Sequence, residues 1–180
     1  MVKKTHILGG VSMGIVAYKA NNVLDIYSSD LTGFILFLPI VTYISGLILG
    51  SLLPDIDTPQ SFLGRIFKFV SIPINKIFGH RTITHSIFFA IFSAGIVILP
   101  SMSIQNPLID SMLTSFGVGI LIGDISHILL DSLTVSGVPF LYPILKSKFS
   151  LTKMKTGGAG EQFISVLLIL SILASTYSLI

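Results

Sequence analysis

Four histidines are the residues of this chain best suited to chemistry, and each lies in or beside an apolar segment with polar neighbours. His127 precedes Asp131 by four residues, so on a helix their side chains share one face. An imidazole and a carboxylate one turn apart can bind a single divalent ion. The alternative is a buried hydrogen-bonded pair that packs helices together. Asp124, nearly one turn earlier, is expected to orient an imidazole instead of binding metal.

Two further carboxylates, Asp55 and Asp57, stand two residues apart in a turn bracketed by Pro54 and Pro59. In a turn they can flank one ion or bridge two, and the alternative is a turn that caps the following segment. We expect Asp55 to be a metal ligand. Asp57 is expected to be a further ligand or the general base.

The segment His80-Arg81-Thr82-Ile83-Thr84-His85-Ser86 combines a permanent cation, two imidazoles and hydroxyl groups. The planar fork of Arg81 suits a phosphate, and the alternative is a lipid-facing charge that sets topology. On a helix Arg81 and His85 would face the same way, with His80 pointing elsewhere. His85 is therefore predicted as a ligand, while His80 and Thr84 are predicted to support the site.

His6 and Glu161 each begin an apolar segment. A lone histidine at such a place is often a solvated cap, and a carboxylate there is favoured by the helix dipole in any case. Together with the other groups, His6 becomes a candidate ligand. Glu161 becomes a candidate ligand or general base.

Composition places the chain in a membrane. Of its 180 residues, 52% are hydrophobic and 11% charged, and the mean hydropathy is +0.91. Soluble proteins carry roughly a quarter charged residues. The net charge of +3 is spread over loops with no basic stripe, which argues against nucleic-acid binding. Without cysteine, a metal must be held by nitrogen and oxygen ligands, which indicates a catalytic site more than a structural one.

Five hydrophobic runs predict an all-α, polytopic membrane protein that forms a single domain over residues 1–180. They lie at 5–20, 33–53, 84–100, 112–130 and 162–180. About 20 residues cross a bilayer as a helix. The first run is the shortest, and its alternative is a re-entrant or interfacial helix. Residues 61–79 predict one short amphipathic helix at the membrane interface.

Basic residues favour five spans with a cytoplasmic N-terminus. Lysines and arginines gather in 54–83 and 141–161, whereas the connection 101–111 has none. The positive-inside tendency puts the two basic loops in the cytoplasm, and five spans place Lys3 and Lys4 there too. All the polar groups named above then fall at one face of the membrane.

Four sequence blocks resemble the YdjM family: Leu53-Pro54-Asp55-Ile56-Asp57; His80-Arg81-x-x-Thr84-His85-Ser86; Gly123-Asp124-x-x-His127-x-x-x-Asp131-x-x-Thr134; and Thr156-Gly157-Gly158-x-x-Glu161. Their order and spacing match over nearly the full length. The resemblance implies a metal-dependent hydrolase of the inner membrane, in a family with some LexA-regulated members. Family members often have histidine after the second aspartate, where this chain has Thr58. A more distant similarity, through His127 and Asp131, is to zinc-dependent phospholipase C and P1 nuclease.

These observations predict a hydrolase that uses one or two divalent ions, zinc being the expected metal. Its substrate would be a membrane lipid or lipid-linked phosphate, cleaved at the cytoplasmic face. The predicted ligands are His6, Asp55, His85, His127 and Asp131. Arg81 would steady the developing charge. The alternative is a non-enzymatic transporter or structural membrane protein with a buried His/Asp network.

Overall fold

The computed structural model describes residues 1–21, 35 and 37–177, and its regular structure within those residues is helical, without a β-strand. The α-helices are α1 (Lys3–Asn21), α3 (Phe37–Gly50), α4 (Phe62–Ile66), α5 (Lys68–Phe78), α6 (Ile87–Ser101), α7 (Pro107–Ser132) and α8 (Ala159–Tyr177). Two 3-10 turns, η2 (Pro54–Asp57) and η3 (Ile83–His85), complete the set. Two isolated bridges, Thr134 with Met154 and Val138 with Phe149, tie the loop between α7 and α8.

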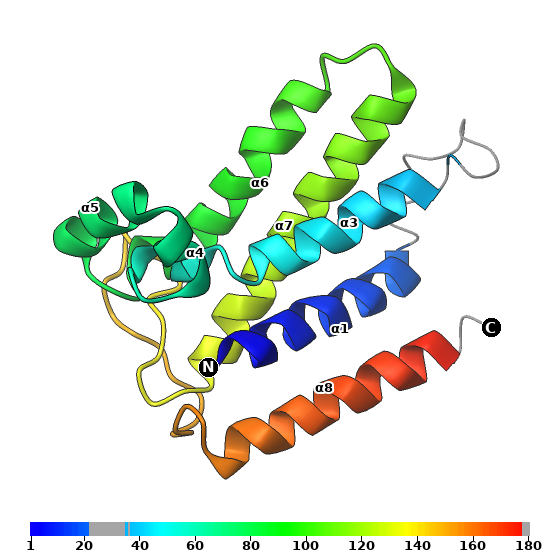
Figure 1. Cartoon of the computed structure of the whole chain (residues 1–180). Helices are drawn as coiled ribbons and strands as arrows, with labels where there is room; N and C mark the ends of the chain where they lie inside the picture. The colour runs from blue at the N-terminus through cyan, green and yellow to red at the C-terminus, as the bar shows by residue number, and fades with distance from the viewer. Residues whose placement is uncertain (22–34, 36, 178–180) are drawn as a thin grey trace.

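The long helix α7 is the centre of the fold, and α1, α3 and α6 pack against it (Figure 1). Glycines bring α3 very close to α7. A Cβ atom added to Gly46 would lie 2.2 Å from the Phe116 carbonyl oxygen, and one added to Gly119 would lie 2.3 Å from that of Tyr43. Small residues of this kind let helix backbones approach inside a membrane. Tyr43 and Leu47 of α3 form a buried core cluster beside this contact.

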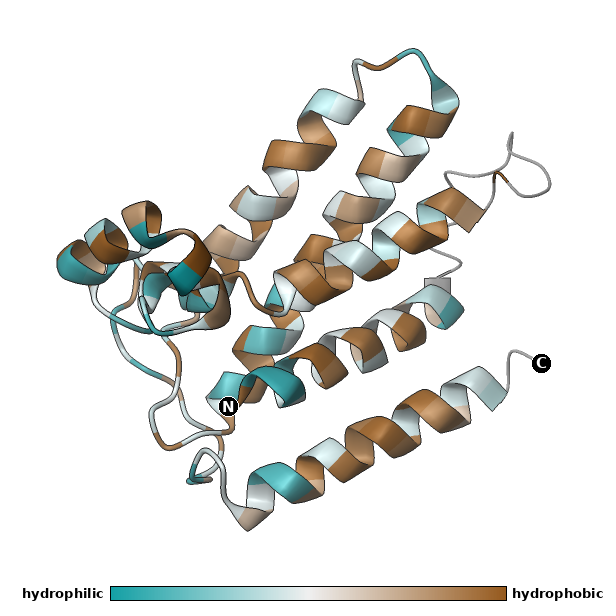
Figure 2. Ribbon diagram, in the orientation of Figure 1, coloured by the Kyte–Doolittle hydropathy of each residue, from teal (hydrophilic) through white to brown (hydrophobic). Residues whose placement is uncertain are grey.

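The helices alternate in direction, and this gathers the polar ends at one side of the bundle (Figure 1). At that side α1, α6 and α8 begin, while α3 and α7 end. The short helices α4 and α5 lie across the same end. Figure 2 shows hydrophilic residues concentrated there and hydrophobic ones along the helices. The predicted convergence of polar residues is therefore present.

Three helical segments of the described chain are long and apolar enough to cross a bilayer: Phe37–Asp57, Pro107–Ser132 and Ala159–Tyr177. Helix α6 is apolar but shorter, with 15 residues. Helix α1 covers the whole of the first hydrophobic run, 5–20, and is outside this set. The membrane-helix class is thus supported, and the number of five spans stays a prediction. Residues 33, 34, 36 and 178–180 of the predicted runs lie outside the described residues.

Two local expectations were wrong. Residues 61–79 form two helices, α4 and α5, because Phe67 leaves helical geometry with φ −106° and ψ 50°. Arg81 and His85 do not share a helix face either. His80 to Thr82 form a bend, His85 ends η3, and α6 begins only after Ser86, whose side chain caps it. The segment that carries two imidazoles is therefore a folded loop.

Candidate metal centre

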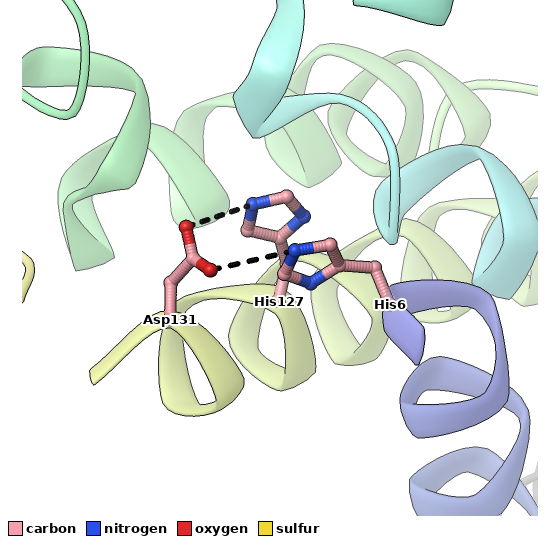
Figure 3. A group of neighbouring side chains, drawn as sticks. All are labelled: His6, His127 and Asp131. Atoms are coloured by element: carbon pink, nitrogen blue, oxygen red, sulfur yellow. Dashed lines mark ion pairs between the residues drawn. The ribbon is translucent and has the colours of Figure 1, made fainter. Parts of the chain in front are cut away.

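The buried carboxylate of Asp131 joins two histidines that come from different helices (Figure 3). His127 lies one turn before Asp131 on α7, and its Nε2 atom is 3.7 Å from Asp131 Oδ2. His6, in the second turn of α1, places its Nε2 atom 3.4 Å from Asp131 Oδ1. The predicted pairing of His127 and Asp131 on one helix face is thus present, with His6 beside it. The Met1 amino group also contacts Asp131 Oδ1.

The two 3-10 turns bring a third histidine, His85, and a second carboxylate, Asp55, to the same place. His85 Nε2 lies 3.6 Å from Asp131 Oδ2 and 3.8 Å from Asp55 Oδ1. His127 Nε2 is also 3.8 Å from Asp55 Oδ1. His85 and His127 therefore each face both carboxylates, whereas His6 faces Asp131. All five residues predicted as ligands meet in one cluster, although α1, η2, η3 and α7 are remote along the chain.

The donor atoms of this cluster fit a divalent ion. His6 Nε2, His85 Nε2 and His127 Nε2 are buried and have no hydrogen-bond partner within the described chain, and Asp131 Oδ2 is buried and pairs with Arg81 Nη2 at 2.8 Å. Buried polar atoms normally have hydrogen-bond partners, so several unpaired imidazole nitrogens close together need an explanation. Ligands of a tetrahedral zinc ion stand about 3.3 Å apart, for bonds near 2.0–2.1 Å. The distances between the histidine Nε2 atoms and the carboxylate oxygens are 3.4–3.8 Å. They are slightly longer than the ligand spacing around zinc and agree with it closely enough for a metal site.

Hydrogen bonds on the far side of two rings aim their Nε2 lone pairs inward. His127 Nδ1 lies 2.7 Å from the Ser51 carbonyl oxygen, which can only accept, so Nδ1 carries the proton. His85 Nδ1 lies 3.1 Å from Thr84 Oγ1 and 3.5 Å from Asp57 Oδ2. Partners of this kind fix the tautomer of a metal-binding histidine. The contribution of the Ser51 carbonyl was not predicted, because a backbone atom leaves no signal in residue type.

Asp57 is surrounded by hydrogen-bond donors. Its Oδ2 atom accepts from the Arg81 backbone N–H at 2.9 Å and from Thr84 Oγ1 at 2.7 Å. Its Oδ1 atom accepts from Thr58 Oγ1 at 3.0 Å and faces His80 Nδ1 at 2.8 Å. A carboxylate so fully engaged is suited to hold neighbours in place. The predicted role as ligand or base is not tested, and these contacts favour a positioning role.

His80 is more exposed than the other imidazoles, with 43% of its side chain accessible. Thr58 gives its hydroxyl proton to Asp57, so His80 Nδ1, 2.8 Å from Thr58 Oγ1, must be the donor in this trio. Atoms of His80, Asp55 and His85 that can bind metal lie within 4.8 Å of one another. His80 thus borders the cluster, and its supporting role stays a prediction. Thr58 accepts the hydrogen bond from His80.

Arg81 is buried against the cluster. Its Nη2 atom pairs with Asp131 Oδ2 at 2.8 Å, and Nη1 donates to Thr134 Oγ1 at 2.8 Å. The residue adopts φ 57°, a left-handed conformation that costs energy in a non-glycine residue. Its Nε atom is buried and has no hydrogen-bond partner among the residues that the structure describes. These contacts place the charge of Arg81 at the centre and contradict a lipid-facing role.

Two predicted site residues have other contacts. Asp124 accepts a hydrogen bond from Ser93 Oγ on α6 at 2.5 Å, and its expected role in orienting an imidazole stays a prediction. Glu161 accepts from the backbone N–H groups of Val2 and Gly157, each at 2.6 Å. The Oε1 atom thus anchors the start of α8 to the N-terminal segment, and the Oε2 atom binds the turn before α8. Its predicted role as ligand or base is not tested.

Comparison with known proteins identifies relatives along most of the chain. The profile of a family described as YdjM inner membrane protein matches residues 1–179. The uncharacterized protein YvsG of Bacillus subtilis is 34% identical over 91% of this chain and 87% of its own length. The inner membrane proteins YdjM of Escherichia coli and of Shigella flexneri are each 38% identical over 67% of this chain and 60% of theirs. No solved structure matches.

Proposed function

The chain belongs to the YdjM family of inner membrane proteins, and we propose that it is a divalent-metal hydrolase that cleaves phosphoester bonds of a lipid or lipid-linked substrate. One observation carries this proposal. Three buried imidazoles turn Nε2 atoms that have no hydrogen-bond partner within the described chain toward one buried carboxylate, which is paired with a buried arginine. A network that served only to pack helices would pair these atoms with one another, because an unsatisfied buried polar group is costly.

The residues that would hold the ion are His6, His85, His127, Asp55 and Asp131. When bound, a divalent ion supplies Lewis acidity, which polarises a phosphoryl oxygen and makes water acidic enough to attack near neutral pH. Zinc suits nitrogen and oxygen donors in this number. The ligand supply allows one or two ions, which leaves the number to experiment.

Arg81 would bind the anionic group of the substrate. Thr134 and Asp131 hold its guanidinium in a fixed orientation, and a planar fork stabilises phosphoryl oxygens as negative charge develops. The left-handed backbone at Arg81 is kept by the hydrogen bond from its N–H to Asp57. Strain at such a position supports a functional part for the side chain.

His80 is the best placed proton donor. With Nδ1–H held by Asp57 and Thr58, a protonated His80 can give its Nε2 proton to the leaving oxygen as the ester P–O bond breaks. Water supplies the oxygen of the new P–O bond. Solvent, which reaches the centre beside the 27% exposed side chain of Asp55, would accept the proton that the attacking water loses.

The location of the cluster favours hydrolysis over transport. Transport sites commonly lie near the bilayer midplane on interrupted helices. Here the groups come from helix ends and from turns at one side of the bundle, within reach of lipid head groups (Figure 1). We infer that this side, with the N-terminus, is cytoplasmic, since all the exposed lysines and arginines except Lys19 lie there.

The test is hydrolysis by the full chain purified in uncharged detergent. Long-chain alkyl phosphates, alkyl diphosphates and phospholipids are offered, and release of phosphate or head group is measured. We expect metal-dependent turnover that a chelator stops and added zinc restores. Absence of turnover on all three classes by metal-loaded protein would overturn the hydrolase, as would unchanged turnover in Asp131→Asn.

A further inference from the structure

A pocket of about 240 Å³ opens beside Asp55, at the edge of the metal centre. Its lining residues come from α1, η2 and α4 and the segments next to them: Lys3, Leu52, Asp55, Gln60, Ser61, Phe62, Leu63 and Arg65. Asp55 connects this pocket to the centre. Its side chain is 27% exposed, whereas those of His85, His127 and Asp131 are at most 1% exposed. A ligand therefore reaches the centre past Asp55.

The pocket is basic. Lys3 and Arg65 line it, and Asp55 is the one acid among its lining residues. A bound metal would neutralise that carboxylate and leave two cations facing the ligand. Lys3 also lies over the Phe62 ring, with its Nζ atom 3.6 Å from the ring centroid. This contact holds the ammonium at the pocket wall.

Arg65 is held in place by the junction of α4 with η2. Ser61 Oγ donates to the Asp55 carbonyl oxygen at 2.7 Å and accepts from the Gly64 N–H at 2.9 Å, so one hydroxyl caps α4 and ties it to η2. A Cβ atom at residue 64 would stand 1.9 Å from the Thr58 carbonyl oxygen. The absence of a side chain at Gly64 thus lets α4 pack closely on the Thr58 backbone, and this packing fixes the backbone position of the neighbouring Arg65.

The surroundings of the pocket suit an anionic amphiphile. Phe62 and Ile66 of α4 are 43% and 57% exposed. The exposed formal charges at this end of the described bundle are all basic: Lys3, Lys4, Arg65, Lys68, Lys76, Lys146, Lys148, Lys153 and Lys155. Its carboxylates, Asp55, Asp57, Asp131 and Glu161, are buried or partly buried.

We propose that this pocket binds a second phosphate of the substrate, next to the one that is cleaved, so that the substrate class is a diphosphate ester. Arg81 would bind the phosphoryl group at the centre, and Lys3 and Arg65 would bind the other on the outer side of Asp55. The inference depends on the proposed function for the role of Arg81 and the metal. The pocket itself can be tested by binding alone.

The experiment measures equilibrium binding of inorganic pyrophosphate and inorganic phosphate to the metal-loaded full chain in uncharged detergent. We expect wild type to prefer pyrophosphate by at least about tenfold, the scale of one charge-assisted contact. Lys3→Gln and Arg65→Gln should lose most of that preference. The control, Lys76→Gln, alters an exposed lysine at the far end of α5 and should keep it. A preference that survives in Arg65→Gln, or that Lys76→Gln loses equally, would overturn the pocket.

A second arm identifies the carrier of the diphosphate. Binding of a long-chain alkyl diphosphate and of inorganic pyrophosphate is compared in Ile66→Ser. Weaker binding of the alkyl compound alone supports a lipid substrate, and unchanged binding of both supports a soluble diphosphate in the same pocket. Pyrophosphate preference without turnover would keep the pocket and overturn the hydrolase. Turnover without any effect of Arg65→Gln would do the reverse.

Discussion

The imidazole rings of His6 and His127 stack face to face, with centroids 3.6 Å apart and planes within 7° of each other. They belong to α1 and α7, and both turn an Nε2 atom toward Asp131 (Figure 3). Stacking fixes two rings at once, so a change in one alters the position of the other. This relationship makes α1 part of the centre, whether or not α1 crosses the membrane.

His6→Gln should therefore weaken metal binding without abolishing it. The variant removes one imidazole and leaves His85, His127, Asp55 and Asp131 in place. We expect zinc affinity to fall by roughly 10–100-fold, the range seen when one supporting contact of a metal site is lost. Competition with a chromogenic chelator measures it. Affinity equal to that of wild type would exclude His6 from the site.

Asp57→Asn tests the positioning role of this carboxylate. Four neighbouring groups address Asp57, and an amide nitrogen cannot accept any of their hydrogen bonds. We expect a loss of about 2 kcal/mol or more in the free energy of unfolding and weaker zinc binding. Denaturant titration in detergent measures the first and chelator competition the second. A variant of normal stability that binds zinc but does not turn over would point to direct participation in catalysis.

His80→Gln should separate proton donation from metal binding. Metal content is expected to stay at the wild-type level, and turnover of an alkyl ester should fall by about 10²–10⁴-fold. A p-nitrophenyl ester needs no proton on its leaving group, so its turnover should change far less. Steady-state rates on the two esters measure the difference. An equal loss on both esters would contradict the assignment of His80 as proton donor.

Gly46→Ala should destabilise the junction of α3 with α7, where a Cβ atom would lie 2.2 Å from a carbonyl oxygen. We expect the free energy of unfolding, measured by denaturant titration in detergent, to fall by about 2 kcal/mol or more. The matched control is Gly95→Ala on α6. A Cβ atom there would lie 4.0 Å from the side-chain atom Leu99 Cδ1, which is ordinary van der Waals contact. That variant should be as stable as wild type or slightly more stable, because alanine favours a helix. Equal free energies of unfolding in Gly46→Ala and Gly95→Ala would contradict the close packing of α3 on α7.

The sequence predicted much of this centre because local spacing carried the information. His127 and Asp131 share a face of α7 since four residues make about one helical turn. The convergence of remote groups followed from helix ends and loop charge. The loop with His80 and Arg81 was misjudged, because a helical pattern of spacing does not reveal a left-handed backbone at Arg81.

Contacts made by backbone atoms and small hydroxyl groups were the least predictable. The Ser51 carbonyl that orients His127 and the Ser93 hydroxyl that binds Asp124 depend on which helices meet and at what height. The spacing of residues along one helix predicts neither which helices pack together nor the relative height at which they do so. The same reason explains why Glu161, at the start of α8, anchors the N-terminal segment through the backbone N–H group of Val2.

The most direct test of the account is the metal content of the full chain purified without chelator. Wild type is compared with His127→Ala and Asp131→Asn by inductively coupled plasma mass spectrometry. Circular dichroism and gel filtration establish that each variant is folded. We expect about one or two divalent ions per wild-type chain and less than about a tenth of that in either folded variant. Equal metal content in all three proteins would contradict the metal centre.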